Sequence, residues 1–337
     1  MFIEGCFFCW GYGNIEKSEL LLSEKDYYYY AYSKQIEGEL SEKTEQWILE
    51  EEDGLYESIN KNNEIISRYN SGELDEGAYG KALYEIQQLT IKQEAFNKAV
   101  SQYRELKEVK DSGIPVHFIN VISTDAMFGN MTQYVYRGML LLLVCVFSLC
   151  GMFSTDYQTG MVYLVHTTRK GRRPLFRAKY LMMFMLYTLG FICFALPYWY
   201  NWIAYYDMHD WNAPLQSILQ FIAVKGNVSI LEFSVMWFVQ MYLSGCIFVI
   251  LQAMLSDVFR KNSTTLIVSA ICAALDFLIS AFSFRWLSLV AISSGFGLPM
   301  LLRSTGDCRL VWVEFIKLIF VATVLLIWHR HLYTHEI

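Results

Sequence analysis

The stretch that decides the fold is Tyr180–Tyr206, which reads YLMMFMLYTLGFICFALPYWYNWIAYY and contains no charged side chain over 27 residues. A helix needs about 20 apolar residues to cross a hydrocarbon core about 30 Å thick. Water-soluble domains seldom contain an uncharged run of this length. The segment is therefore predicted to be a membrane-spanning helix.

Four other segments fit the same criterion. The segment at 135–154 passes Arg137, whose long side chain can reach the membrane interface, and the segment at 263–284 contains Asp276. The last carries Glu314 and Lys317 near one end. The sequence predicts an all-α integral membrane protein with five spanning helices, at about 135–154, 180–206, 232–256, 263–284 and 311–328.

A sixth apolar segment, at about 286–302, allows two interpretations. It is uncharged but holds Gly295, Gly297 and Pro299 within five residues. Glycine and proline do occur in membrane helices, yet this cluster favours a broken, re-entrant or interfacial segment over a sixth span. The choice matters because a sixth span would change which side of the membrane the C-terminus reaches.

Charge is distributed very unevenly along the chain. Over the whole sequence 54% of residues are hydrophobic and 18% are charged, with a mean hydropathy of +0.27. Residues 14–113 hold 22 acidic and 12 basic side chains, whereas the remainder holds 11 and 15. An acidic module joined to an apolar one excludes a single soluble globule, a secreted disulfide scaffold and a nucleic-acid-binding protein.

The acidic module is predicted to be a helical hairpin within residues 14–133. Apolar side chains recur at helical spacing in Lys34–Tyr69 and Leu74–Val109, and Asn70-Ser71-Gly72 supplies the break. Two antiparallel helices packed along these stripes are expected. The tyrosines of Tyr27–Tyr30 are expected to cover the base of the hairpin or to lie at the membrane surface.

The basic residues of the short loops predict the orientation. Cytoplasmic loops are enriched in Lys and Arg. Nine basic residues fall on one side of the five spans and four on the other, so the richer side is predicted to be cytoplasmic. The hairpin module is then outside and the C-terminus is inside. The nine are Arg169, Lys170, Arg172, Arg173, Arg177, Lys179, Arg260, Lys261 and Arg330; the four are Lys225, Arg285, Arg303 and Arg309.

An external module of this size needs a hydrophobic segment ahead of it for export. Residues 1–13 are too short to span, include Glu4 and lack a basic flank and a cleavage pattern. We therefore expect that a first spanning helix precedes Met1 and that residues 1–13 are its outer end.

Residue patterns of several enzyme classes are absent from the sequence. There is no G-x-x-x-x-G-K-[ST] phosphate loop and no H-E-x-x-H zinc motif, and the spans hold no paired acids or histidines at helical spacing. The tail histidines His329, His331 and His335 could bind a metal, but cations at a helix C-terminus are favourable in themselves. We predict no enzyme activity, no resident cofactor and no metal site.

Asp276 lies in the middle of a predicted span, where an ionised aspartate costs about 2.5–3.5 kcal/mol. Two roles would explain its presence. The residue could couple transport to protons, or it could be a protonated side chain hydrogen-bonded to a neighbouring helix. One acid does not make a relay, so the second is favoured.

The loop after the first predicted span carries the most informative pattern. Residues 156–173 read DYQTGMVYLVHTTRKGRR, and Ala178-Lys179 leads into the next span. An acidic residue and a glycine precede a short apolar turn, which ends in a glycine-containing basic segment. This is similar to the first cytoplasmic loop of the type 2 ABC transporter permease family. The expected topology, a large external domain after the first helix and a re-entrant pair before the last, also resembles that family.

The resemblance implies a half-transporter without its own ATPase motif, located in the plasma membrane of a bacterium. The loop would be a coupling helix that docks on a separate ATP-binding cassette subunit, which binds the ATP. A second permease subunit, identical or different, would complete the exporter. The substrate is not identified by the sequence, although aromatic-rich spans suit an amphipathic or lipid-like one. The residues expected to meet the ATPase are Asp156, Gly160, Tyr163, Leu164, Thr167, Thr168, Arg169, Gly171, Arg172 and Arg173.

The alternative from another class is a membrane sensor or accessory protein. In that case the external hairpin binds a ligand and the spans signal inward through a partner. Only about nine residues follow the last predicted span, so such a sensor would have no cytoplasmic effector domain in this sequence.

Overall fold

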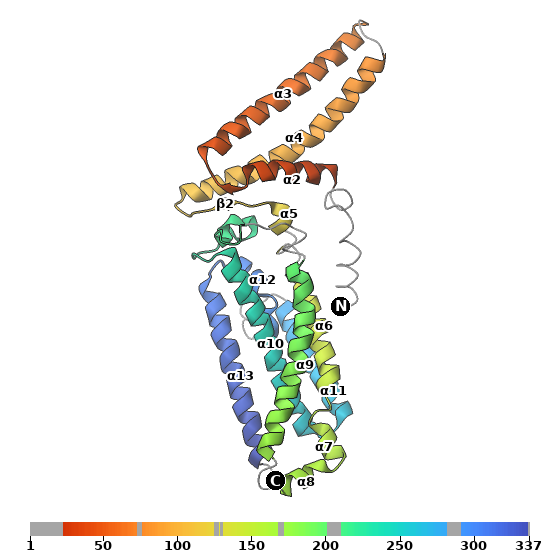
Figure 1. Cartoon of the computed structure of the whole chain (residues 1–337), viewed down its shortest axis with the longest axis vertical. Coiled ribbons are helices and arrows are strands. Elements are labelled where there is room, and N and C mark those ends of the chain that lie inside the picture. The colour runs from red at the N-terminus through yellow and green to blue at the C-terminus, as the bar shows by residue number, and fades with distance from the viewer. Residues whose placement is uncertain are drawn as a thin grey trace. The chain divides into compact units, whose positions relative to one another are not determined.

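The computed structural model describes residues 23–72, 76–124, 128, 131–167, 172–200, 210–281 and 291–335. The chain divides into two compact units (Figure 1). The membrane unit comprises Met1–Cys9, Met127–Ala204 and Ala223–Ile337, and the hairpin unit comprises Trp10–Ala126 and Tyr205–Ile222. The expected helix remnant at residues 1–13 lies outside the described residues.

Three helices form most of the hairpin unit: α2 (Glu24–Ile36), α3 (Glu42–Asn70) and α4 (Glu76–Asp111). The first predicted helix, from Lys34, begins eight residues too early. The chain leaves α2 after Ile36, forms strand β1 (Gly38–Glu39) and enters α3 at Ser41, whose hydroxyl accepts a hydrogen bond from Thr44 N at 3.3 Å. Such an N-cap satisfies one of the free amides of the first turn and so fixes where the helix starts.

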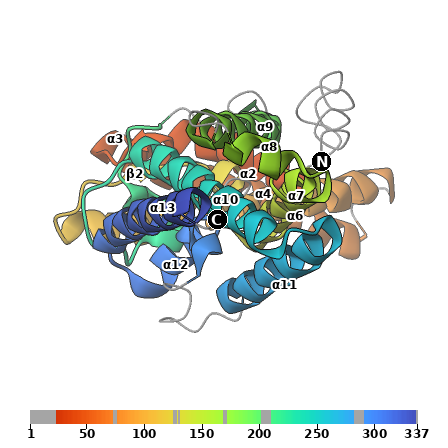
Figure 2. The ribbon, with the colours of Figure 1, turned by 90° about the horizontal axis from the view of Figure 1, so that it is seen from below.

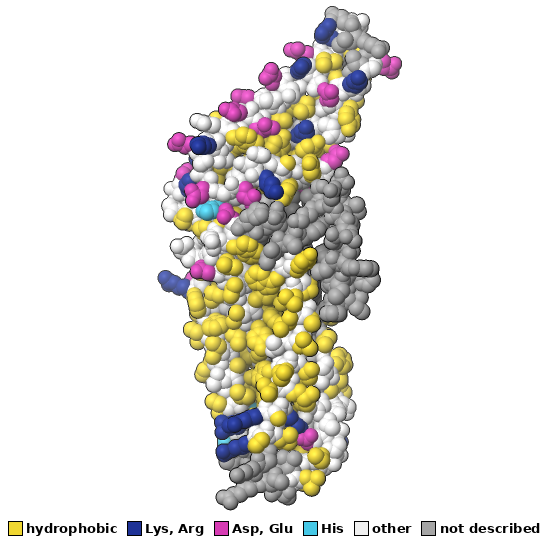
Figure 3. All heavy atoms as spheres, viewed as in Figure 1, with side chains coloured by type: hydrophobic (Ala, Val, Ile, Leu, Met, Phe, Trp, Pro, Cys, Tyr) yellow, Lys and Arg dark blue, Asp and Glu magenta, His cyan; other side chains and the backbone are white. Residues whose placement is uncertain are grey.

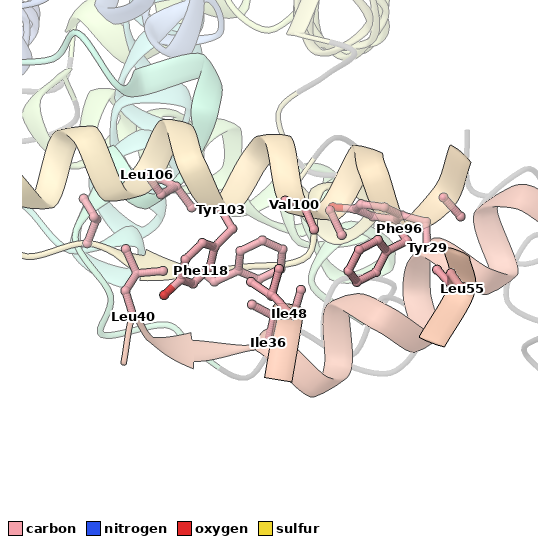
Figure 4. Packing of buried hydrophobic residues seen from close by; sticks show 13 residues of the cluster. Tyr29, Ile36, Leu40, Ile48, Leu55, Phe96, Val100, Tyr103, Leu106 and Phe118 are labelled. Carbon is pink, nitrogen blue, oxygen red and sulfur yellow. The ribbon is translucent and has the colours of Figure 1, made fainter. Parts of the chain in front are cut away.

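One hydrophobic core joins the three helices (Figure 4). Side chains of α4 point towards α2, α3 and strand β2 (His117–Phe118), which pairs antiparallel with β1. The helix stripes predicted from the sequence therefore pack against each other as expected for a hairpin, with α2 added. The core residues that Figure 4 labels are Tyr29, Ile36, Leu40, Ile48, Leu55, Phe96, Val100, Tyr103, Leu106 and Phe118.

The tyrosine run lies in α2, and Tyr29 is buried inside this core. Its hydroxyl donates to Gln102 Oε1 at 2.6 Å and accepts from Val121 N at 3.1 Å. Gln102 in turn donates to the carbonyl of Ile119 at 2.7 Å. Tyr29 thus connects α2 to α4 and to the short helix α5 (Val121–Thr124).

The connection between the second and third apolar helices also belongs to the hairpin unit. It contains the short helices η3 (Leu215–Ser217) and η4 (Leu219–Phe221). Ser217 Oγ accepts a hydrogen bond from His117 N at 3.0 Å, and His117 Nδ1 lies 3.1 Å from Asp210 Oδ2. Nothing in the sequence predicted that this connection would join the hairpin unit, whose contact residue His117 lies more than ninety residues before Asp210 and Ser217.

The membrane unit is built from helices α6 (Met131–Leu149), α9 (Arg172–Tyr200), α10 (Ile230–Phe259), α11 (Asn262–Ala281) and α13 (Arg309–His335). Each is part of a segment long and apolar enough to cross a membrane, so the five predicted spans are confirmed by length and composition. The protein is an all-α, multi-pass membrane protein. On the face in Figure 3, hydrophobic side chains cover the middle of this unit, and Lys and Arg side chains gather near one end.

Helix α10 lies at the centre of the unit and contacts α6, α9, α11 and α13 (Figure 2). It starts at a capping box in which Ser229 accepts from Glu232 N and the Glu232 carboxylate accepts from Ser229 N. Its buried share, 61%, far exceeds the 17% of α11 and α13. Apolar side chains all round are expected for a helix surrounded by others.

The described part of the sixth apolar segment is broken into two short helices. They are η5 (Ile292–Gly295) and α12 (Leu298–Thr305), and Gly306 ends α12 in a left-handed conformation. Eight residues of helix extend about 12 Å, too little for a hydrocarbon core of about 30 Å. Neither helix can cross a membrane alone, and a re-entrant course for the whole segment stays a prediction.

We predict that Tyr29→Phe destabilises the hairpin unit by about 1–3 kcal/mol, because Gln102 Oε1 and Val121 N would be left buried without their partner. Hydrogen–deuterium exchange of the full chain should then be faster in α2 and α4. Tyr27→Phe, at a half-exposed ring, is the matched control and should change nothing. Equal exchange in both variants would contradict the role assigned to Tyr29.

Candidate functional site

Two short helices, labelled α7 and α8 in Figure 1, form the loop between α6 and α9 at one end of the membrane unit. They are α7 (Ser154–Gln158) and α8 (Met161–Thr167). Gly160 joins them with a φ of 75°, a left-handed conformation that glycine adopts without strain. The glycine singled out from the sequence is therefore the corner at which the chain turns into α8.

Helix α8 presents an apolar surface to its surroundings. Tyr163 is 71% exposed, Leu164 is 65% exposed and Met161 is 50% exposed, whereas Val162 is buried. Exposed apolar side chains grouped on a loop with basic flanks are typical of a contact surface for a partner or for lipid headgroups. We call Met161, Tyr163 and Leu164 the α8 surface.

Helix α7 is fixed to the ends of the neighbouring spans. Asp156 forms an ion pair with Lys179 of α9, and Lys179 also donates to the carbonyl of Met152 at 2.5 Å. The hydroxyl of Ser154 donates to Asn262 Oδ1 at the start of α11. Ser256 of α10 accepts from Ser154 N at 2.9 Å. The loop is thus attached to three different helices, and a force on it would reach all of them.

A buried polar network that the sequence did not predict lies behind α7. Asp257 of α10 accepts a hydrogen bond from Tyr157 at 2.6 Å and lies 3.4 Å from His329 Nε2 of α13. The other ring nitrogen of His329 lies 2.6 Å from the Tyr180 hydroxyl of α9. His329 is fully buried. The network therefore joins α7, α9, α10 and α13 at one end of the unit.

A metal role for the tail histidines has no support among the described residues, where no group of three or more His, Cys, Asp or Glu side chains could hold a metal ion. His329 instead packs against the rings of Phe153 and Phe176, with centroid distances of 5.2 and 5.3 Å.

The structure brings part of the predicted coupling loop together. Asp156, Gly160, Tyr163 and Leu164 lie on α7, α8 and the corner between them. Thr167 is the last residue of α8, and Arg172 is the first residue of α9, but their side chains are not described. Arg173 is exposed on the first turn of α9. Thr168, Arg169 and Gly171 lie outside the described residues.

Asp276 accepts hydrogen bonds from two backbone amides. Its Oδ1 receives Ile292 N at 2.7 Å and its Oδ2 receives Ser293 N at 2.8 Å. Both amides belong to the first turn of η5, where backbone N–H groups lack helical partners. Both oxygens of the side chain therefore act as acceptors. Asp276 thereby attaches the broken segment to α11.

Comparisons of the chain with protein-family models, with curated proteins and with solved structures find no match.

We predict that Tyr157→Phe weakens the α7 end of the unit, because the buried carboxylate of Asp257 loses the hydrogen bond that Tyr157 donates. Removing such a bond costs about 1–3 kcal/mol. The thermal midpoint of the detergent-solubilised protein should fall. Tyr163→Phe, at an exposed ring with no such bond, should leave it unchanged; equal midpoints would show that the Asp257 bond does not stabilise the unit.

Replacing Asp276 by Asn should release η5 from α11, because the amide group would turn a donor towards one of the two backbone N–H groups. Hydrogen exchange at Ile292 and Ser293 should rise at least tenfold. Leu275→Ala, on the exposed side of the same helix turn, is the control. Protection that survives Asp276→Asn would mean that other contacts hold η5.

Proposed function

We propose that the chain is the membrane-spanning subunit of an ATP-driven exporter of the type 2 ABC permease kind. In this proposal a separate subunit hydrolyses ATP and docks on the α8 surface. The observation that carries the proposal is the combination of an exposed apolar helix with rigid attachment. Helix α8 offers Tyr163 and Leu164 outward, while α7 beside it is bonded to α9, α10 and α11.

This arrangement suits the transfer of mechanical work. A partner that moves the α8 surface also moves Asp156 and Ser154, which are fixed to three spans. The buried network of Tyr157, Asp257 and His329 extends the connection to α13. Packed helices tend to shift between discrete arrangements and not to deform continuously, so a push at one end can move a whole helix.

The proposal includes an orientation. The end that carries α7 and α8 also carries the basic residues of the predicted cytoplasmic loops, among them Arg173, Arg177 and Arg260. By the positive-inside rule this end faces the cytoplasm, where ATP and an ATPase subunit are present. The hairpin unit then faces outward, in the plasma membrane of a bacterium. A second permease subunit, identical or different, is part of the proposal.

Transport would proceed by alternating access. ATP binding closes the ATPase subunits, the α8 surfaces move together, and the spans expose the substrate path outward. The aromatic-rich spans favour an amphipathic substrate. Arg172 and Arg173 follow the docking element in the sequence and, in this proposal, meet acidic groups of the ATPase or anionic lipid headgroups.

We predict that the double variant Tyr163→Ala/Leu164→Ala lowers the amount of ATPase subunit that copurifies from native membranes by at least tenfold. A central Tyr at an interface can contribute about 2 kcal/mol or more, so losing Tyr163 together with Leu164 should weaken docking strongly. Copurification is measured by quantitative mass spectrometry after gentle solubilisation.

The matched control is Tyr56→Ala/Leu49→Ala, the same two residue types at exposed positions of α3 in the hairpin unit. This control should retain the ATPase subunit fully. An undiminished ATPase in the α8 variant would refute docking on this surface, and the absence of any ATPase from the unmodified protein would refute the proposed function itself.

A further inference from the structure

Asp257 and His329 form a buried pair whose attraction depends on the charge of the imidazole ring. His329 Nε2 lies 3.4 Å from Asp257 Oδ2, which is within ion-pair distance, yet no hydrogen bond reaches this ring nitrogen. The other carboxylate oxygen, Asp257 Oδ1, accepts from the Tyr157 hydroxyl at 2.6 Å. Because no hydrogen bond joins the ring to the carboxylate, their attraction is mainly Coulombic and is strong only when the ring carries a proton.

The second ring nitrogen does not select one charge state. His329 Nδ1 lies 2.6 Å from the Tyr180 hydroxyl of α9. A tyrosine hydroxyl can donate to an unprotonated nitrogen or accept from a protonated one. This contact is therefore kept whether the ring is neutral or charged, and the carboxylate of Asp257 is the partner that distinguishes the two states.

Aromatic rings pack around the fully buried imidazole. The ring centroids of Phe153, Phe176 and Tyr180 lie 5.2, 5.3 and 5.7 Å from that of His329. The ring of Tyr333 lies 6.4 Å away. Aromatic rings within about 6 Å attract a cation, most strongly where water is excluded. These surroundings suit an imidazolium paired with a carboxylate.

The other ionisable groups described near the pair keep one charge state around neutral pH. They are Tyr157 of α7, Lys179 and Tyr180 of α9, Arg260 at the end of α10 and Tyr333 of α13. Lys179 is paired with Asp156, and Arg260 lies 4.9 Å over the Tyr157 ring. Tyrosine, lysine and arginine ordinarily change charge only near pH 10 or above, whereas histidine does so between about pH 5 and 8. A change of charge at this point near neutral pH therefore falls on His329.

The C-terminal half of α13 has few other buried side chains. The structure describes all of Ile319–Tyr333, and in this range only His329 and Tyr333 are buried. Their neighbours Ile327 and Trp328 are 63% and 55% exposed. The contact of His329 with Asp257 is therefore a main attachment of this end of α13 to α10.

We propose that Asp257 and His329 bind one proton and that the protonated pair is a latch between α10 and the C-terminal end of α13. With the proton bound, the imidazolium and the carboxylate attract each other and hold the end of the helix. When the proton leaves, this attraction is lost and the end of α13 opens more often. The latch needs no ATPase subunit, so its test is separate from that of the proposed function.

The experiment is hydrogen–deuterium exchange of the purified, detergent-solubilised full chain, with rates corrected for the intrinsic effect of pH. A proton that favours the closed latch stabilises it at low pH, and this stabilisation is lost as the pH rises. We therefore expect exchange in residues 325–333 to rise about tenfold between about pH 5.5 and about pH 8.5. Residues 311–318 of the same helix should change little.

His329→Gln and Asp257→Asn should both remove this pH dependence, because neither can form the charged pair. His331→Gln, at an exposed histidine two residues further along α13, is the matched control and should keep it. If a variant does not fold, the unmodified chain still tests the sign of the effect. Slower exchange at high pH, no dependence on pH, or a dependence that persists in His329→Gln would each overturn the proposal.

Discussion

A carboxylate inside an apolar helical unit must find donors within the protein, and this constraint explains much of the structure. Each of the six acidic side chains in the described part of the membrane unit has such a donor: Asp156, Glu232, Asp257, Asp276, Asp307 and Glu314. Only Lys179 and Lys317 supply charge; the other donors are backbone amides and hydroxyl groups, with His329 also near Asp257. An uncompensated charge in lipid is costly. The bonds of Asp156, Asp257, Asp276 and Glu314 join different helices, whereas those of Glu232 and Asp307 are local contacts at helix starts.

The polar contacts are concentrated near the two ends of the helices. At one end Asp156, Tyr157, Asp257 and His329 attach α7 to the spans. At the other end Asp276 and the Glu314–Lys317 pair hold the short helix η5 between α11 and α13. In the middle of the unit the described residues include fewer polar contacts between helices, such as Tyr187 and Thr188 of α9 with Tyr242 of α10, and apolar side chains make up most of the packing. With this arrangement, a displacement of α7 and α8 at one end can move the attached helices as rigid bodies, as the exporter proposal requires.

The spans and the hairpin helices could be predicted from the sequence because both depend on local patterns. An uncharged run longer than 20 residues has few outcomes besides a membrane helix, and the stripe through Phe96, Val100 and Tyr103 defines one face of α4. The predicted start of α3 was wrong. The helical pattern continues through residues 34–41, but the chain breaks after Ile36 and a new helix begins at the N-cap Ser41.

The polar networks could not be predicted, since their members are far apart in sequence. Asp257 and His329 lie 72 residues apart at the ends of apolar runs, and nothing in the sequence indicated that they pair; the packing of α10 on α13 brings them together. For Asp276 the sequence favoured a protonated side chain hydrogen-bonded to a neighbouring helix. Its acceptor role towards the amides of Ile292 and Ser293 depends on where the chain breaks. The addition of the 210–222 connection to the hairpin unit likewise follows from tertiary contacts such as His117 with Ser217.

The measurement that tests the central claim most directly is photo-crosslinking in native membranes. A photoreactive amino acid replaces Tyr163, the most exposed residue of the α8 surface, and crosslinked peptides are identified by mass spectrometry. The account predicts crosslinks to a subunit that contains a G-x-x-x-x-G-K-[ST] phosphate loop, and none to it when the same amino acid replaces Tyr56. Crosslinks to lipid alone, or to proteins without that loop, would contradict it.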